Sequence, residues 1–217
     1  MSDINKRFPV LGNGWIELQD MMGDDNAIVA AARTSYLGES KGPEKDKALL
    51  FRLMQDGHNG PFEHVRLKFR VYAPVLVWWQ WVRHRTGSFN LRSGRYVTFG
   101  DEFHMPQEWR HNDGAAIPDG TFWTQKLEEH TAKGYQLYTS AMAAGIHREQ
   151  ARLFLPFAAV MYPGVWSTDA HNLMHFLGLR MDDGAQYEIR VYAQAIYEHI
   201  FKPSLPWTAE AFEEYRL

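Results

Sequence analysis

The fold is decided by residues 63–96, which read EHVRLKFRVYAPVLVWWQWVRHRTGSFNLRSGRY. Over residues 63–72 apolar and polar side chains alternate, which predicts a strand with one face in the core and the other in water. Pro74 then begins a helix that is apolar almost all round; we expect it to run to about Arg85, where Gly87 ends it. This stretch therefore predicts a buried strand and helix that hold the polar segment after them in a fixed place.

That polar segment, residues 83–96, is rich in side chains that bind phosphate. Five of its fourteen residues are Arg or His, and two glycines and two serines add backbone and hydroxyl donors. The planar guanidinium of Arg matches phosphate oxygens in a bidentate manner. The segment therefore predicts a site for phosphorylated ligands. The alternative is that Arg83 and Arg85 are only favourable cations at the carboxyl end of a helix.

The composition is that of a globular protein. The 217 residues are 45% hydrophobic and 14% aromatic, which is enough for a large core. The formal net charge of −3 indicates no general affinity for nucleic acid. The chain has no cysteine, which excludes disulfides, thiolate metal sites and a cysteine nucleophile. Residues 1–7 lack the apolar core of a signal peptide and no apolar run has the length of a membrane span, so we expect a cytoplasmic protein with no membrane partner.

The rest of the chain predicts many helices and few strands. Further strands are expected at residues 14–22, 96–99 and 158–168, and a long loop at residues 100–119. Helices are expected at residues 27–33, 45–56, 121–144, 148–154, 169–181 and 185–201, and from Thr208 onward. No βαβ alternation and no internal repeat is present. We therefore predict a single α+β domain over residues 1–217, with a small, mostly antiparallel sheet and many helices.

Residues Arg83-His84-Arg85, followed after seven residues by Ser93, resemble the signature of the flavin-dependent thymidylate synthases. The resemblance extends through residues 57–64, 151–156, 177–180 and 206–208, and so covers almost the whole chain. It implies a homotetramer of α+β subunits with active sites shared between protomers. It also implies FAD reduced by NADPH, with methylenetetrahydrofolate as the carbon donor for C5 of dUMP. The absence of cysteine agrees independently, because the unrelated class of thymidylate synthases uses a cysteine thiolate.

The resemblance implies two sets of site residues. The set for the nucleotide is Gln80, Arg83, Leu91, Ser93, Gly94, Arg95, Arg152 and Arg180. Within it Arg180 is the catalytic candidate, facing the uracil ring, where its charge can stabilise negative charge on the ring oxygens. Ser93 is expected to bind and not to act as a nucleophile. The set for the flavin is Ser35, His58, Glu63, Arg83, His84, Arg85, Thr86, Asn90, Asp169, His171 and His175.

Several positions depart from the family's pattern. Leu91 stands where Glu or Gln is usual, and its side chain cannot hydrogen-bond a sugar. Asp169 and His171 replace an Asn and an Arg expected near the flavin, and Arg92 replaces an apolar residue. These departures suggest the hypothesis of a relative that methylates UMP, as similar enzymes of nucleoside antibiotic pathways do. The alternative is a catalytically silent nucleotide- or nucleic-acid-binding protein on the same fold. An RNA-binding module is disfavoured by the acidic charge balance.

Some of these residues also have structural interpretations. His171 and His175 have the i, i+4 spacing of a metal site, but the glutamate of a zinc-protease helix is missing because Asn172 follows His171, so we predict no metal. His58 and His64 can be structural histidines. Arg152 and Arg180 can be held by structural ion pairs. For the tryptophans Trp78, Trp79 and Trp81 we expect core packing.

Overall fold

Strand β3 (Arg66–Pro74) is the middle strand of a five-stranded antiparallel sheet with the order β1-β2-β3-β5-β4. The structure is a computed structural model that describes residues 4–35 and 38–217. The predicted alternation is confirmed, because Leu67, Phe69 and Val71 are at most 1% exposed while the charged residues between them face water. The strand begins later than predicted because residues Gly60–His64 form a 3-10 turn.

The other strands are β1 (Arg7–Val10), β2 (Gly14–Met22), β5 (Met161–Asp169) and β4 (Ser88–Leu91). The strands predicted near residues 14–22 and 158–168 are confirmed. The strand predicted at residues 96–99 is wrong: Tyr96 N and Val97 N donate to the Ser93 carbonyl in a turn, and the edge strand is Ser88–Leu91. Gly87 permits this pairing, since a Cβ there would lie 2.3 Å from the indole nitrogen of Trp166 on β5.

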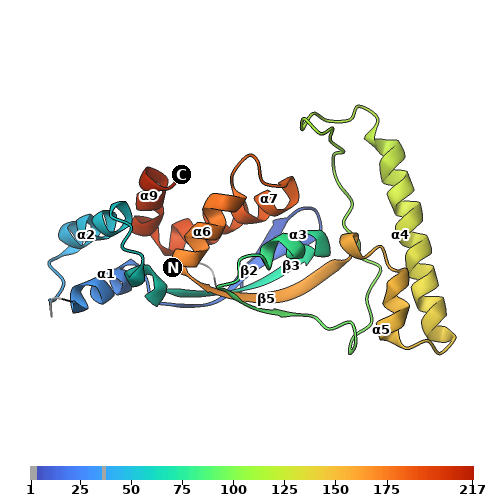
Figure 1. The fold of residues 1–217 in the computed structure, drawn as a ribbon, viewed down its shortest axis with the longest axis horizontal. Coiled ribbons are helices and arrows are strands. Elements are labelled where there is room, and N and C mark those ends of the chain that lie inside the picture. Colours follow the sequence, from blue (N-terminus) through green and yellow to red (C-terminus); the bar gives the residue numbers. More distant parts are fainter. Residues whose placement is uncertain (1–3, 36–37) are drawn as a thin grey trace.

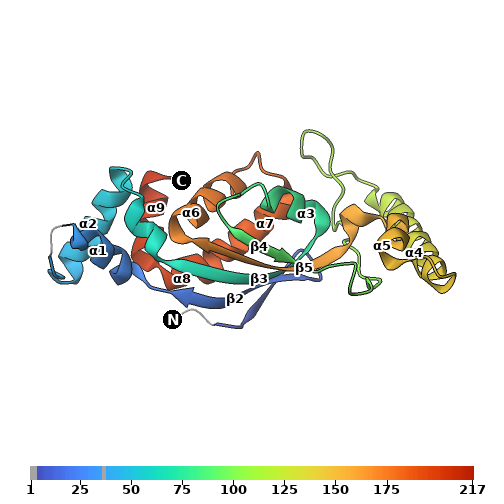
Figure 2. The ribbon, with the colours of Figure 1, turned by 60° about the horizontal axis from the view of Figure 1, so that its bottom comes forward.

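The helices lie mainly over one face and one end of the sheet (Figures 1 and 2). Helices α6 (Ala170–Arg180) and α7 (Tyr187–Ile196) cover the sheet, and α7 continues as a π-helical turn over Tyr197–Phe201 and α8 (Lys202–Ser204). Helices α1 (Asp25–Thr34), α2 (Pro43–Gln55) and α9 (Pro206–Tyr215) pack together at one end. Gly57, which directly follows the helix predicted at residues 45–56, has the left-handed φ of 71° that is typical of a helix end. The predicted α+β fold is confirmed.

The core centres on Trp81, the last residue of α3 (Val75–Trp81). Its indole is fully buried and lies 5.1–5.8 Å, centroid to centroid, from the rings of Trp78, Trp166, Phe176 and Tyr192. Core packing is thus confirmed for Trp78 and Trp81, but Trp79 is 57% exposed. Helix α3 ends at Trp81 and not near Arg85, because residues 82–87 fold into tight turns. The polar segment therefore begins directly at the edge of the aromatic core.

A separate arm extends beyond the sheet (Figure 1). It consists of α4 (Gly120–Ala143), α5 (Arg148–Ala151) and a 3-10 turn at Arg152–Phe154. A second 3-10 turn, Phe157–Ala159, connects the arm to β5. The Tyr138 hydroxyl of α4 accepts a hydrogen bond from Phe99 N, which ties the arm to the chain beyond the polar segment. The long connection predicted for residues 100–119 is present. Over the described ranges, no helix combines the length and apolarity needed to cross a bilayer.

Candidate active site

Arg180, at the end of α6, lies at the centre of the polar site. Its Nε donates to His84 Nε2 at 3.0 Å, and its two Nη atoms donate to the side-chain and main-chain oxygens of Gln80 at 3.3 and 3.4 Å. Gln80 lies on α3, and His84 lies in the turn after it. The antiparallel sheet and the aromatic core bring these elements together. Three sequence-predicted residues thus form one hydrogen-bonded group, the Arg180 group.

His84 is held neutral in this group. Its side chain is buried among Phe176, His175 and Arg180. Burial, followed by the charge of Arg180 and then by His175, lowers the pKa of His84 to about 4. Because Nε2 accepts from Arg180, the ring proton is on Nδ1. His84 therefore orients Arg180 without forming an ion pair with it, and the guanidinium keeps its full charge for a ligand.

Neutral His84 predicts a loss of stability in mild acid. An unfolded histidine binds a proton near pH 6.5, whereas folded His84 does so only near pH 4. Between these values the unfolded state binds more protons, so the free energy of unfolding falls as pH falls from about 6.5 to about 4. His104, whose pKa is also lowered by burial, adds to the slope. In His84→Gln the slope should be shallower than in the wild type, measured by urea denaturation across this range; equal slopes would contradict the assignment.

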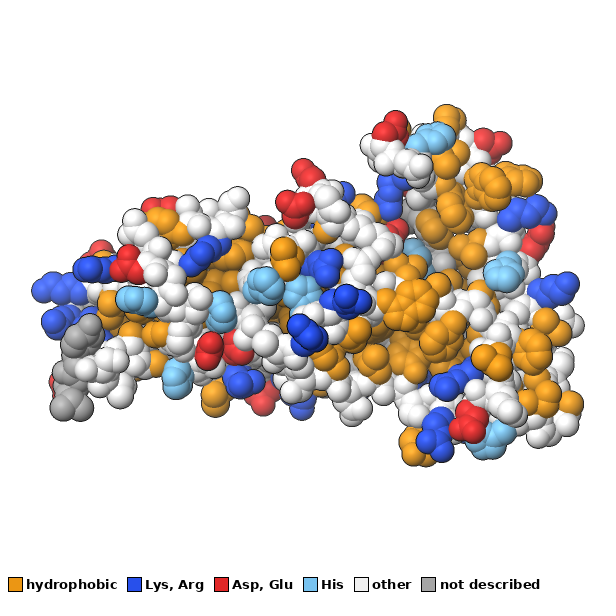
Figure 3. All heavy atoms as spheres, in the orientation of Figure 1, with side chains coloured by type: hydrophobic (Ala, Val, Ile, Leu, Met, Phe, Trp, Pro, Cys, Tyr) orange, Lys and Arg blue, Asp and Glu red, His pale blue; other side chains and the backbone are white. Residues whose placement is uncertain are grey.

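Two further cations of the motif, Arg83 and Arg85, are exposed beside this group. Within residues 4–35 and 38–217 neither guanidinium makes a hydrogen bond or ion pair. Burial, followed by the charge of Arg83, lowers the pKa of Arg180. Figure 3 shows Arg and His side chains gathered at the middle of this face, between α6 and α3. Cations with free donors suit an anionic ligand.

Thr86 connects the motif to the start of α6. Its hydroxyl and Asn172 Oδ1 lie 2.7 Å apart, while Asn172 donates through its main-chain and side-chain nitrogens to Asp169 at 2.9 Å. Asp169 is buried and caps α6. Its carboxylate therefore serves the helix and Asn172, which explains an acidic residue at this position without a flavin contact.

The remaining residues predicted to bind the nucleotide form a second group beside α5. Arg95 Nε lies 3.1 Å from a Glu149 carboxylate oxygen, and Arg152 Nε donates to the Glu149 carbonyl at 3.1 Å. Gly94 lies against Arg152 and Phe99, and Ser93 begins the turn. No hydrogen bond or ion pair connects this Arg152 group to the Arg180 group within the described part of the chain. The sequence predicted one nucleotide site, and a single chain presents it as two groups.

Strand β4 carries Asn90 and Leu91 between the two groups. Asn90 is exposed, whereas Leu91 is partly buried and packs with Trp78 against Gly164 of β5. The Leu91 side chain thus has a packing role that the sequence did not indicate. Arg92, unexplained by the sequence, donates to the Thr98 carbonyl at 2.7 Å and so closes the loop that carries Ser93 and Arg95.

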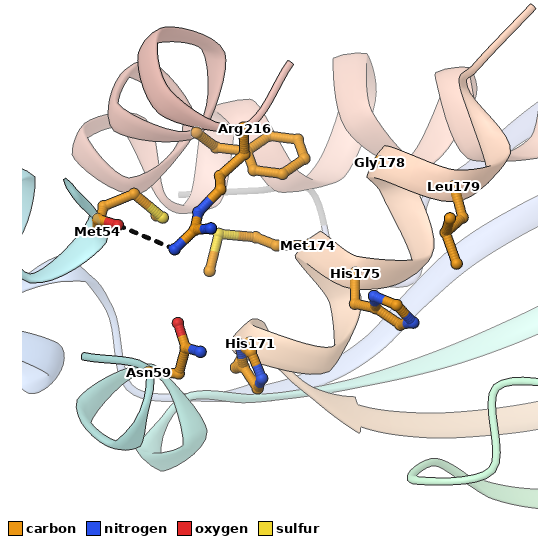
Figure 4. Close-up of a pocket in the computed structure, with 9 residues that line it drawn as sticks. Met54, Asn59, His171, Met174, His175, Gly178, Leu179 and Arg216 are labelled. Atoms are coloured by element: carbon orange, nitrogen blue, oxygen red, sulfur yellow. Dashed lines mark hydrogen bonds between the residues drawn. The ribbon is translucent and has the colours of Figure 1, made fainter. Parts of the chain in front are cut away.

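A cavity of about 340 Å³ opens beside α6 (Figure 4). His171 and His175 line it, with Asn59, Met174 and Arg216 among its other walls, and Arg216 Nη2 donates to the Met54 carbonyl at 3.1 Å. Two predicted flavin residues therefore share one cavity. Among the described residues no cluster of three His, Cys, Asp or Glu side chains could hold a metal. His58 and Glu63 are exposed around the Gly60–His64 turn, and exposed Ser35 is the C-cap of α1.

Sequence reasoning missed three residues behind the Arg180 group. Gln80 Nε2 donates to Gln186 Oε1, Gln186 Nε2 donates to Glu188 Oε2 at 2.7 Å, and Arg110 Nη2 donates to Glu188 Oε1 at 3.0 Å. No local pattern marks them, because Gln186 is over a hundred residues from Gln80 and only the packing of α7 beside α3 brings them together.

Comparisons with known proteins agree with this geometry. The family model "Thymidylate synthase complementing protein" matches residues 17–207. The flavin-dependent thymidylate synthase of Thermosipho africanus is 44% identical, with 94% of this chain and 93% of the relative covered. The flavin-dependent thymidylate synthase of Thermotoga neapolitana is 42% identical, with 96% of this chain and 95% of the relative covered.

A solved structure of similar fold is the UMP/dUMP methylase PolB from Streptomyces cacaoi. Bound with 5-Br dUMP, it is 28% identical with a TM-score of 0.88, covering 96% of this chain and 98% of that one. Bound with 5-Br UMP, it is 30% identical with a TM-score of 0.81, covering 94% and 95%. The polar segment with Arg83 and Arg85 points to the same family as these likenesses, which extend over nearly the full length of the chain. The chain therefore belongs to the family of flavin-dependent thymidylate synthases.

Proposed function

We propose that this flavin-dependent methyltransferase adds a methyl group to C5 of a uridine monophosphate nucleotide, dUMP or UMP, with methylenetetrahydrofolate as carbon donor and NADPH as reductant. The observation that carries the proposal is the Arg180 guanidinium, fixed by neutral His84 and by Gln80 next to unpaired Arg83. Family membership supports the reaction class, and the two solved complexes of PolB support both nucleotides as candidates.

Arg180 is the residue to which we assign electrostatic catalysis. Of its five N–H groups, three donate to His84 and Gln80, which leaves two that can face a uracil ring. Bond formation at C5 moves negative charge onto the ring oxygens, and a fixed, charged donor stabilises that charge without reorganising. Gln80 and Arg83 would hold the same nucleotide beside it.

The residues around the cavity fit a flavin. The exposed Arg83 and Arg85 suit a diphosphate or an anionic reduced ring, and the cavity lined by His171 and His175 provides partly apolar walls for a flat ligand. We propose that His84, Thr86, Asn90, His58, Glu63 and Ser35 complete this binding surface. When bound, FAD would supply the reducing equivalents that convert the transferred carbon into a methyl group.

The division of the nucleotide residues into two groups supports a homotetramer with shared active sites. Ser93, Gly94, Arg95 and Arg152 would bind the phosphate of a nucleotide whose ring lies at Arg180 of another protomer. Large apolar side chains next to the Arg152 group are exposed, including Tyr96 at 76% and Leu153 at 82%. Figure 3 shows an apolar area toward the α4–α5 arm. Such a patch is typical of a surface that a partner covers.

The direct test is spectroscopic. Protein loaded with FAD should absorb in the visible, should bleach when NADPH is added, and should convert dUMP or UMP to its 5-methyl product in the presence of methylenetetrahydrofolate, followed by mass spectrometry. Nucleotide binding without NADPH oxidation or product would instead support the silent binding protein.

Parallel rates with the two nucleotides test sugar specificity. Leu91 offers no side-chain acceptor to the sugar, so we expect UMP to be accepted as well as dUMP. A strong preference for dUMP would contradict the UMP hypothesis and leave the methylation of dUMP in place.

A further inference from the structure

A chain of polar side chains runs from the Arg180 group to the long connection between the sheet and the arm. Arg180 donates to Gln80, Gln80 to Gln186 and Gln186 to Glu188, and Arg110 holds the other carboxylate oxygen of Glu188. We call this the Glu188 relay. Glu188 is buried, with its side chain 12% exposed, and Arg110 is stacked over Tyr187 at 4.2 Å. The carboxylate end of the relay is thus fixed in place.

The two ends of the relay determine the direction of every bond in it. An arginine can only donate, and an ionised glutamate can only accept. Gln186 must therefore turn its NH₂ group to Glu188 and its oxygen to Gln80, and Gln80 must turn its NH₂ group to Gln186 and its oxygen to Arg180. If either amide were flipped, two donors or two acceptors would face each other and the hydrogen bond between them would be lost. The Gln80 oxygen is thus directed at Arg180, and both ends of the relay, the donating guanidinium of Arg180 and the accepting carboxylate of Glu188, favour this direction.

We propose that Glu188 is a positioning residue for the reaction: through Gln186 it fixes the amide orientation of Gln80 and thereby the guanidinium of Arg180. This inference rests on the proposed function, since it assigns Arg180 to the uracil ring. Glu188 itself touches neither Arg180 nor Gln80 in the structure. Its effect is transmitted by bond direction. In Glu188→Gln the residue at 188 can donate as well as accept, so the relay loses its fixed direction.

The test is a double-mutant cycle on nucleotide affinity, measured by calorimetry with the FAD-loaded protein and both dUMP and UMP. Glu188→Gln should raise Kd about five- to tenfold, the range of one well-made hydrogen bond. In the Gln80→Leu background the same change should raise Kd by less than about twofold, because the relay is already interrupted. Glu198→Gln, which removes the same charge from an exposed position beyond α7, should leave Kd unchanged.

Two results would overturn the proposal: a wild-type Kd in Glu188→Gln, or an equal loss with and without Gln80, which would indicate a general effect on the fold. A readout without nucleotide separates failure of the relay from failure of the proposed function. The charge of Arg180 helps to keep the pKa of His84 low, so a displaced Arg180 should let that pKa rise in Glu188→Gln, followed by NMR titration of the His84 ring. If the wild type binds neither nucleotide, the proposed function fails, and an unchanged His84 titration then refutes the relay as well.

Discussion

Arg180→Ala lowers kcat/KM for methylation of the uridine nucleotide by about a hundredfold or more. The change removes the donor that we propose for the uracil ring and leaves His84 Nε2 and the Gln80 oxygen without their partner. Loss of the two hydrogen bonds that the charged guanidinium would donate to the ring costs about 3 kcal/mol, which is about two powers of ten in rate. Steady-state kinetics with dUMP and UMP, followed by formation of the 5-methyl product, measure the effect.

Two variants control this prediction. Arg180→Lys keeps the charge but lacks the planar fork that His84 and Gln80 hold, so most of the loss should remain. Arg190→Ala removes an arginine of α7 that pairs with exposed Asp183, and kcat/KM should change little. Near-wild-type kinetics in Arg180→Ala would refute the catalytic role of Arg180 and shift the task to Arg83.

Trp81→Ala destabilises the protein by about 3–5 kcal/mol. Trp81 is fully buried, and its indole touches four other aromatic rings of α3, β5, α6 and α7. Removing it leaves a large cavity at the point where the helices that carry Gln80 and Arg180 meet. Urea denaturation gives the free energy of unfolding, and we expect weakened flavin binding in the same variant because α3 and α6 lose their common contact.

The matched control is Trp81→Phe. The indole nitrogen of Trp81 is buried without a hydrogen-bond partner among the described residues, so a phenyl ring loses volume but no polar contact. Trp81→Phe should lower the free energy of unfolding by much less than Trp81→Ala. Trp123→Ala, at a half-exposed tryptophan of α4, should cost less than about 1 kcal/mol. A loss at Trp123 equal to that at Trp81 would contradict a core centred on Trp81.

The elements that the sequence predicted well are those in which apolar residues recur at a regular local spacing. β3 was recognisable because one of its faces is buried and the other is wet, and α2 and α4 lie close to the helices predicted at residues 45–56 and 121–144. The short edge strand β4 was missed, and residues 96–99 were assigned to it instead. Pairing with β5 depends on the contacts of Gly87 and Gly164 with Trp166 and Trp78, which lie far away in sequence.

The polar segment at residues 83–96 resembles a family signature, which implied a family and a reaction class, and it contains half of the candidate residues. Only the tertiary structure decided how they act together: Arg180 is joined to His84 and Gln80, Asp169 serves as a helix cap, and Leu91 packs inward. It also revealed Gln186 and Glu188. The reason is physical, because residue type fixes which groups can donate, accept or carry charge, whereas the direction and neighbour of each hydrogen bond depend on segments a hundred residues apart.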